Sequence, residues 1–134
     1  MKINELRIGN LVSHGTLHTG IGRNGRDYYT IKELTENIIF FEESIVGEYY
    51  KDVQPILLTK EWLIKFGFKY DTINYFYSNS ELMLAPNKDG GFDVWYHTLS
   101  YGKLYLKLMY VHKLQNLYFE LEEKELTLGD NEQK

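Results

Sequence analysis

Residues 103–123, KLYLKLMYVHKLQNLYFELEE, contain a change of apolar spacing that decides the fold class. From Leu104 to Leu108 a leucine stands at every second position, which predicts a half-buried antiparallel strand. From Tyr110 the apolar residues recur at i, i+4, i+7, i+8 and i+11, which predicts a helix over residues 110–123. A strand followed directly by an amphipathic helix is typical of an α+β fold.

The segment before this stretch predicts an antiparallel sheet with a short helix in front of it. Thr59 is a suitable N-cap for a helix that ends before Gly67, which fits a left-handed C-cap. Clusters of Ser, Asn, Asp and Gly separate four candidate strands, at residues 69–77, 81–86, 92–98 and 102–108. We therefore expect a helix, a four-stranded antiparallel meander and a C-terminal helix, in that order.

The N-terminal part of the chain predicts a small β-barrel-like lobe. Asn24-Gly25 between two β-rich runs is a strong hairpin signal. Short strands at this spacing indicate a small barrel or curled sheet, and we expect them at residues 6–12, 16–22, 28–34, 38–42 and 46–53. Pro55 ends the pattern, so the expected lobes are residues 1–54 and a helix-meander-helix lobe at 55–134. The first lobe alone would bury little apolar surface, so we expect one integrated domain.

The composition restricts the classes of function. The chain has 134 residues, a formal net charge of −4, no cysteine and 16% aromatic residues. The acidic balance argues against general nucleic-acid binding, and the missing cysteine excludes disulfides and thiolate metal sites. No apolar run approaches the ~20 residues of a membrane helix, and the N-terminus has no signal-peptide core. We therefore expect a cytoplasmic protein with no membrane partner.

Three blocks of sequence together resemble a known family. They are NELRIGNLV at residues 4–12, PILLTKEWL with a following FGF within residues 55–68, and YVHKLQNLYF with a following EL within residues 110–126. The family consists of small uncharacterised proteins of gut Bacteroidales and of the phages and prophages that infect them. Leu57 and Lys113 depart from the family pattern, which has a proline and a glutamine at these places. The resemblance implies a mobile-element context and supplies no activity, cofactor or catalytic residue.

A glycine-rich stretch carries the first candidate site. Residues 20–25, GIGRNG, match G-x-G-x-x-G, but a strand is predicted after them, whereas a dinucleotide fold needs a helix there. One alternative is that Arg23 and Arg26 grip a phosphate while Tyr28 and Tyr29 stack on a base. The other is an ordinary exposed hairpin tip.

The histidines do not form a metal or catalytic set. His14 and His18 have no third ligand in a nearby position, so no metal site is expected. His112, Gln115 and Asn116 lie beside the apolar stripe of the C-terminal helix. They either line a pocket facing the meander or form hydrogen bonds with the backbone of an adjacent loop. No nucleophile or acid stands at a diagnostic spacing, so we expect no catalytic residue and no enzyme.

The aromatic residues of the meander provide the remaining candidates. Tyr75 and Tyr77, and likewise Trp95 and Tyr96, have aromatic neighbours in sequence, so aromatics must point to both faces of the sheet. One face packs on the C-terminal helix, and the other either packs on the N-terminal lobe or binds a partner.

Together these observations predict a non-enzymatic binding protein of phage or prophage origin that acts on host machinery or defence. Its expected partner is a host or phage protein or a second copy of the chain, and no cofactor is expected. The alternative is a protein that sequesters a nucleotide or other small ligand with the hairpin at residues 20–29.

Overall fold

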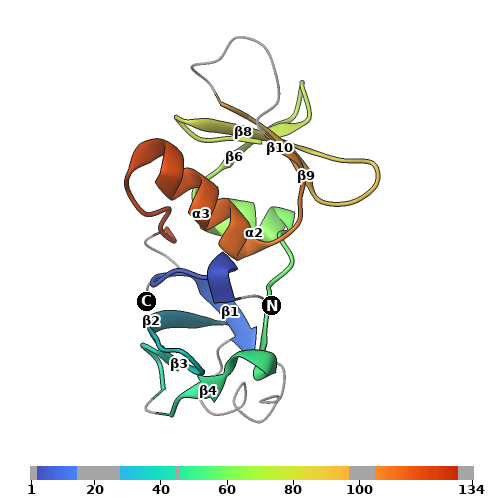
Figure 1. Cartoon of the computed structure of the whole chain (residues 1–134). Helices are drawn as coiled ribbons and strands as arrows, with labels where there is room; N and C mark the ends of the chain where they lie inside the picture. The colour runs from blue at the N-terminus through green and yellow to red at the C-terminus, as the bar shows by residue number, and fades with distance from the viewer. Residues whose placement is uncertain (1–2, 15–27, 45, 97–104, 130–134) are drawn as a thin grey trace. The chain divides into compact units, whose positions relative to one another are not determined.

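The computed structural model has a mixed α+β fold with two antiparallel sheets and two α-helices (Figure 1). This confirms the predicted fold class. The residues that the structure describes are 3–14, 28–44, 46–96 and 105–129.

The chain divides into two compact units, each of which is described by itself. Unit 1 consists of Met1–Ile56 and Val111–Glu125, and unit 2 consists of Leu57–Tyr110 and Leu126–Lys134. The first boundary lies close to the predicted one at residue 54. The C-terminal helix falls in unit 1, whereas the sequence groups it with the meander at residues 55–134.

The sheet of unit 1 is barrel-like, as predicted. Its strands are β1 (Leu11–His14), β2 (Tyr29–Leu34), β3 (Ile38–Phe41), β4 (Glu48–Tyr49) and β5 (Val53–Gln54), in the order β4-β3-β2-β1-β5. A single turn of 3-10 helix, η2 (Tyr50–Asp52), connects the two strands at the ends of this order, so the sheet is nearly closed. Its core is formed by Leu6, Val12, Tyr29, Ile31, Ile39, Phe41 and Val53.

The start of unit 1 differs from the predicted strand at residues 6–12. A 3-10 turn, η1 (Ile3–Glu5), comes first, and β1 begins only at Leu11. Gly9 lies between them with a φ of 98°, a left-handed conformation that glycine adopts easily and that interrupts an extended strand. The predicted strand at residues 16–22 and the Asn24-Gly25 turn lie outside the described residues.

Unit 2 begins with the short helix that the sequence predicts, α2 (Lys60–Lys65). The hydroxyl of Thr59 accepts a hydrogen bond from the backbone N–H of Trp62, so the predicted N-cap is confirmed. Gly67 has a φ of 91°, and the backbone N–H of Phe68 donates to the carbonyl of Leu63 at 3.0 Å. This is the predicted left-handed C-cap, which directs the chain from α2 into the sheet.

The sheet of unit 2 is an antiparallel meander with one strand more than predicted. Its strands are β6 (Lys69–Asp71), β7 (Phe76–Ser78), β8 (Leu82–Pro86), β9 (Phe92–Tyr96) and β10 (Tyr105–Leu108), in the order β10-β9-β8-β7-β6 (Figure 1). The predicted strand at 69–77 is a hairpin, because one Asp71 carboxylate oxygen accepts the backbone N–H groups of Ile73 and Asn74. Such an Asx turn stops an extended strand.

The C-terminal helix, α3 (Val111–Glu122), forms over the predicted residues. It contacts β1 of unit 1. The helix belongs to unit 1 because its buried polar side chains form hydrogen bonds with the N-terminal segment.

Gly91, in the turn between β8 and β9, provides a test of the meander. A Cβ at this position would lie 2.9 Å from the backbone oxygen of Leu108, and the φ of 69° is already unfavourable for other residues. We expect Gly91→Ala to lower the free energy of unfolding by about 1–3 kcal/mol, measured by urea denaturation. Gly129→Ala is the control, because its nearest neighbour is 3.5 Å away. Equal effects of the two variants would contradict the described turn.

Candidate functional site

The side-chain amide of Gln115 on α3 forms hydrogen bonds with two backbone groups of the N-terminal segment, which comprises residues 5–11. Its Nε2 donates to the carbonyl of Gly9 at 3.1 Å, and its Oε1 accepts the N–H of Leu11 at 2.8 Å. The side chain is buried, so the pairing satisfies polar groups that water does not reach.

Asn116, the next residue of α3, continues this pairing. Its Nδ2 donates to the carbonyl of Glu5 at 2.8 Å. Its Oδ1 accepts hydrogen bonds from Nδ2 of Asn10 at 2.8 Å and from Nε of Arg7 at 3.2 Å. For both amides the structure therefore shows the second of the two predicted uses, which is hydrogen bonding to an adjacent backbone segment.

Arg7 is a central residue that the sequence did not single out. Its guanidinium forms an ion pair with Glu125 and lies 4.4 Å from the centre of the Phe119 ring. These partners lie more than a hundred positions away along the chain, so no local pattern could reveal them. Arg7 is therefore engaged within unit 1.

His112 is buried on the same helix and close to two charged groups. Its Nε2 lies 3.7 Å from a carboxylate oxygen of Glu5, which also pairs with Lys113 at 3.0 Å. Burial lowers the pKa of His112, the positive charge of Lys113 lowers it further, and Glu5 opposes the shift. The imidazole is therefore neutral at pH 7, and its position indicates a packing role.

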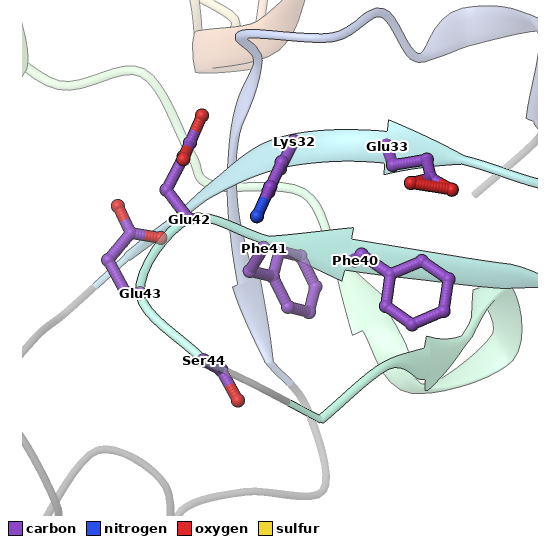
Figure 2. A pocket seen from close by; sticks show the side chains of 7 residues that line it. All are labelled: Lys32, Glu33, Phe40, Phe41, Glu42, Glu43 and Ser44. Atoms are coloured by element: carbon purple, nitrogen blue, oxygen red, sulfur yellow. The ribbon is translucent and has the colours of Figure 1, made fainter.

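A pocket in unit 1 of about 420 Å³ lies beside the β2–β3 hairpin. Figure 2 shows its side chains, which are Lys32 and Glu33 on β2, Phe40 and Phe41 on β3, and Glu42, Glu43 and Ser44 after β3. The register of the two strands shifts between Ile31 and Glu33, which leaves Lys32 and Glu33 both exposed. The pocket thus combines three carboxylates with one ammonium group.

The pocket has only part of what a metal or nucleotide site requires. Glu43 is committed to Thr30, whose N–H and hydroxyl donate to its carboxylate at 2.7 and 2.6 Å. No described group of three or more His, Cys, Asp or Glu residues is arranged to hold a metal ion. Tyr29 packs against Phe41 in the core with ring centres 5.4 Å apart, and Tyr28 is half-buried. Arg23 and Arg26 lie outside the described residues.

Unit 2 contains a second concave surface, which we call the tyrosine groove. It has a volume of about 600 Å³ and is lined by Lys60, Glu61, Ile64 and Lys65 of α2 and by Tyr70 and Tyr77 of the β6–β7 hairpin. The two tyrosines are directly opposite each other on neighbouring strands, with ring centres 4.7 Å apart. Burial, Tyr70 and Glu61 raise the pKa of Tyr77, so its hydroxyl stays protonated at neutral pH.

The turn beside this groove exposes two large apolar side chains. Ile73 is 81% exposed and Tyr75 is 68% exposed. The turn is well defined, because Asp71 binds the backbone N–H groups of Ile73 and Asn74 and its carbonyl accepts the N–H of Tyr75 at 2.9 Å. Tyr75 has a φ of 61°, which lies in the left-handed region that bulky residues rarely adopt.

The candidate aromatic residues at the end of β9 are only partly exposed. Trp95 on β9 is opposite Met83 on β8, and both side chains, like Tyr96, are half-buried. The strongly exposed apolar residues of unit 2 lie instead mainly on α2 and the β6–β7 hairpin. The sequence does indicate the turn between β6 and β7, because Asp71-Thr72-Ile73-Asn74 has a turn composition that is incompatible with one long strand.

Comparison of the chain with protein-family models, curated proteins and solved structures gives no match. Among the described residues, no helix has the length and apolar character needed to cross a membrane. Function is therefore inferred from the geometry and chemistry of the surfaces themselves.

Gln115 provides a test of the pairing between α3 and the N-terminal segment. Gln115→Ala leaves the carbonyl of Gly9 and the N–H of Leu11 without their partner in a buried place. We expect the free energy of unfolding to fall by about 1–3 kcal/mol for each group, measured by urea denaturation. Glu120→Ala on the exposed side of α3 is the control and should change little. A negligible effect of Gln115→Ala would contradict the described hydrogen bonds.

His112 gives unit 1 a predicted pH dependence. Because its folded pKa lies below the unfolded value of about 6.5, the unfolded chain binds the extra proton more readily. The contribution to stability is complete above pH 6.5 and decreases as the pH falls toward the folded pKa. We expect His112→Gln to weaken the dependence of the unfolding free energy on pH below about 6.5. An unchanged slope would show that His112 is solvated and not buried.

Proposed function

We propose that this protein is a non-enzymatic binding protein that contacts a partner protein through one surface of unit 2. This hairpin surface consists of Ile64, Tyr70, Ile73 and Tyr75, with the tyrosine groove beside them. The observation that carries the proposal is the concentration of exposed large apolar side chains within residues 64–75.

Such a concentration is uncommon on a surface that faces only water. Single exposed apolar residues are ordinary, whereas neighbouring ones mark interaction sites. Tyrosine is also enriched among the residues that carry binding energy at interfaces, because it combines rigid apolar area with a polar end. Ile64 and Tyr70 are 54% and 43% exposed and flank the groove, so the surface has both protruding and concave parts.

The turn supports a binding role because its own hydrogen bonds fix its shape in the absence of a partner. The hydrogen bonds from Ile73, Asn74 and Tyr75 to Asp71 fix the backbone on which the two exposed side chains are displayed. A surface that is already ordered loses less conformational entropy on binding, so more of the contact energy appears as affinity.

The other candidate residues are used within unit 1 and support a packing role. Gln115 and Asn116 are paired with backbone groups, and His112 is buried and neutral at pH 7. This supports a binding protein over an enzyme built on these side chains.

The proposal includes the biological setting that the resemblance implies. We propose a phage or prophage protein that acts in the cytoplasm of a bacterial host, where its partner is a component of host machinery or defence. A second copy of this chain is the alternative partner for the same surface.

Capture from a Bacteroidales lysate tests the proposal. The immobilised chain is compared with Ile73→Ser and Tyr75→Asn, since asparagine tolerates the left-handed conformation at position 75. Ile8→Ser in unit 1 is the matched control, because Ile8 is 56% exposed. We expect specific partners that are retained by the wild type and the control and are lost from the two hairpin variants.

Sedimentation velocity over a range of concentrations distinguishes the two kinds of partner. Self-association that is lost in Ile73→Ser identifies the second copy as the partner. If the wild type at micromolar concentration captures nothing specific and remains monomeric, or if the hairpin variants capture the same proteins, the proposal fails.

A further inference from the structure

We infer that the outer edge of β6 pairs with the same edge of a second copy of this chain. The two strands run antiparallel, and Tyr70 of one copy lies directly opposite Tyr70 of the other. The inference goes beyond the proposed function, because it concerns the edge of the sheet and leaves Ile73 and Tyr75 of the turn open to a different partner.

β6 provides an open edge of the meander. It is the last strand in the order of its sheet and, among the described residues, pairs only with β7. In that same part of the chain, no backbone hydrogen bond outside the β6–β7 pair involves Lys69 or Tyr70. The N–H and C=O groups on the outer side of β6 can therefore accept another strand, which satisfies them with its own backbone.

The charges of β6, Lys69-Tyr70-Asp71, are complementary to those of the same strand in the opposite direction. In an antiparallel pair centred on Tyr70, Lys69 of each copy lies opposite Asp71 of the other. Lys69 is exposed and Asp71 is partly exposed, so both can reach a neighbouring strand. Opposite charges directly across two strands stabilise the pairing, whereas like charges oppose it. An edge that carries both signs of charge therefore matches a second copy of itself.

The same charges determine the register of the pair. A pair centred on Lys69 places two lysines opposite each other, and a pair centred on Asp71 places two aspartates opposite each other. Parallel pairing in register also sets like charge against like charge. Only the antiparallel register on Tyr70 brings both charges of the strand opposite a charge of the other sign, and a two-fold axis generates it.

Asp71 keeps its negative charge while it closes the turn. Hydrogen bonds from the backbone of Asn74 and Ile73, and from the Asn74 side chain, lower the pKa of Asp71. A carboxylate has about four acceptor positions, and the turn uses three of them. The carboxylate is therefore ionised at neutral pH and retains capacity for the ammonium group of Lys69 in a second copy.

Tyr70 gives the pair an apolar contact on one face of the sheet. Its ring packs against Tyr77, with centres 4.7 Å apart, and its side chain is still 43% exposed. Aromatic side chains directly opposite each other on two strands form a favourable cross-strand pair. Because β6 has three residues, the contact is small, and we expect a weak dimer with a Kd of about 0.1 mM.

Pairing at β6 leaves the turn accessible. The turn follows the paired strand, and two antiparallel strands end at opposite ends of the pair. The dimer therefore displays Ile73 and Tyr75 once at each end, where both copies can bind the partner of the proposed function.

Sedimentation velocity tests the self-association and its charge dependence. We expect the wild type to change from monomer to dimer between about 5 μM and about 1 mM. Lys69→Glu places a glutamate opposite Asp71 and is expected to raise the Kd at least about fivefold. Lys88→Glu is the matched control, because it makes the same change of charge at an exposed lysine of the β8–β9 turn. A chain that stays monomeric throughout, or equal effects of the two variants, would overturn the inference.

Asp71→Asn tests the other half of the charge pair. The asparagine oxygen still accepts the backbone N–H groups of Ile73 and Asn74, so the turn is retained while the charge is lost. We expect a dimer weakened by about two- to fivefold, since each attraction becomes neutral and not repulsive. An unchanged Kd would show that Asp71 does not face Lys69 of the second copy, and the register would be wrong.

A disulfide locates the contact. The chain has no cysteine, so Tyr70→Cys introduces a single thiol. In the inferred register it lies opposite its own copy with the Cβ atoms about 4.5–5.5 Å apart, close to the separation that a disulfide spans. On mild oxidation we expect it to form a covalent dimer at least about tenfold faster than Ile73→Cys. Ile73 is 81% exposed, so random collision would favour this control, and equal or faster cross-linking of the control would overturn the inference.

The two proposals can fail separately. If lysate capture depends on Ile73 and Tyr75 while the chain stays monomeric, the inferred pairing is wrong and the proposed function stands. If the dimer forms through Lys69 and Tyr70 while the hairpin variants capture the same proteins as the wild type, the proposed function fails and the pairing stands. If hydrogen exchange at Lys69–Asp71 slows with a captured protein but not with rising chain concentration, the edge accepts a foreign segment, and the second copy is the wrong occupant.

Discussion

Unit 1 depends on the hydrogen bonds between two amide side chains of α3 and the backbone of the N-terminal segment. Gln115 and Asn116 satisfy groups of Glu5, Gly9 and Leu11 that precede or begin β1. Without them, buried donors and acceptors would lose their partners at a cost of about 1–3 kcal/mol each. These bonds also fix where β1 begins, and β1 pairs with both β2 and β5 in the barrel-like sheet. The positions of Gln115 and Asn116 on α3 therefore determine where β1 begins.

Local patterns in the sequence predicted much of the fold because characteristic residues mark where its helices and strands begin and end. Thr59 and Gly67 mark the two ends of α2, and the leucine alternation before residue 108 marks β10. The assignment of α3 to unit 1 could not be predicted, because its apolar stripe indicates burial but not the partner. That information lies in the matching of two amides with a backbone segment more than a hundred residues away. The exposed turn was missed because β-prone residues at 69–77 concealed the turn signal of Asp71.

Polar residues have different roles in the core of unit 1 and at the candidate site of unit 2. In unit 1 the polar residues of α3 that the sequence offers as site candidates make their contacts within the unit itself. In unit 2 an aspartate closes a tight turn, and the turn presents Ile73 and Tyr75 to solvent. A partner can thus be bound by apolar contact, while the order of the turn limits the entropy lost on binding.

The discontinuous make-up of unit 1 has a consequence for how the protein is made. Residues 5–11 leave the ribosome about a hundred residues before the amides that complete their hydrogen bonds, whereas the strands of unit 2 all pair with neighbours in sequence. Short loops close at a lower entropic cost and more quickly than long ones. The meander can therefore form during synthesis, while the hydrogen bonds of Glu5, Gly9 and Leu11 form only after α3 is made. During that interval the backbone groups of Glu5, Gly9 and Leu11 that α3 pairs are exposed to chaperones and to other nascent chains.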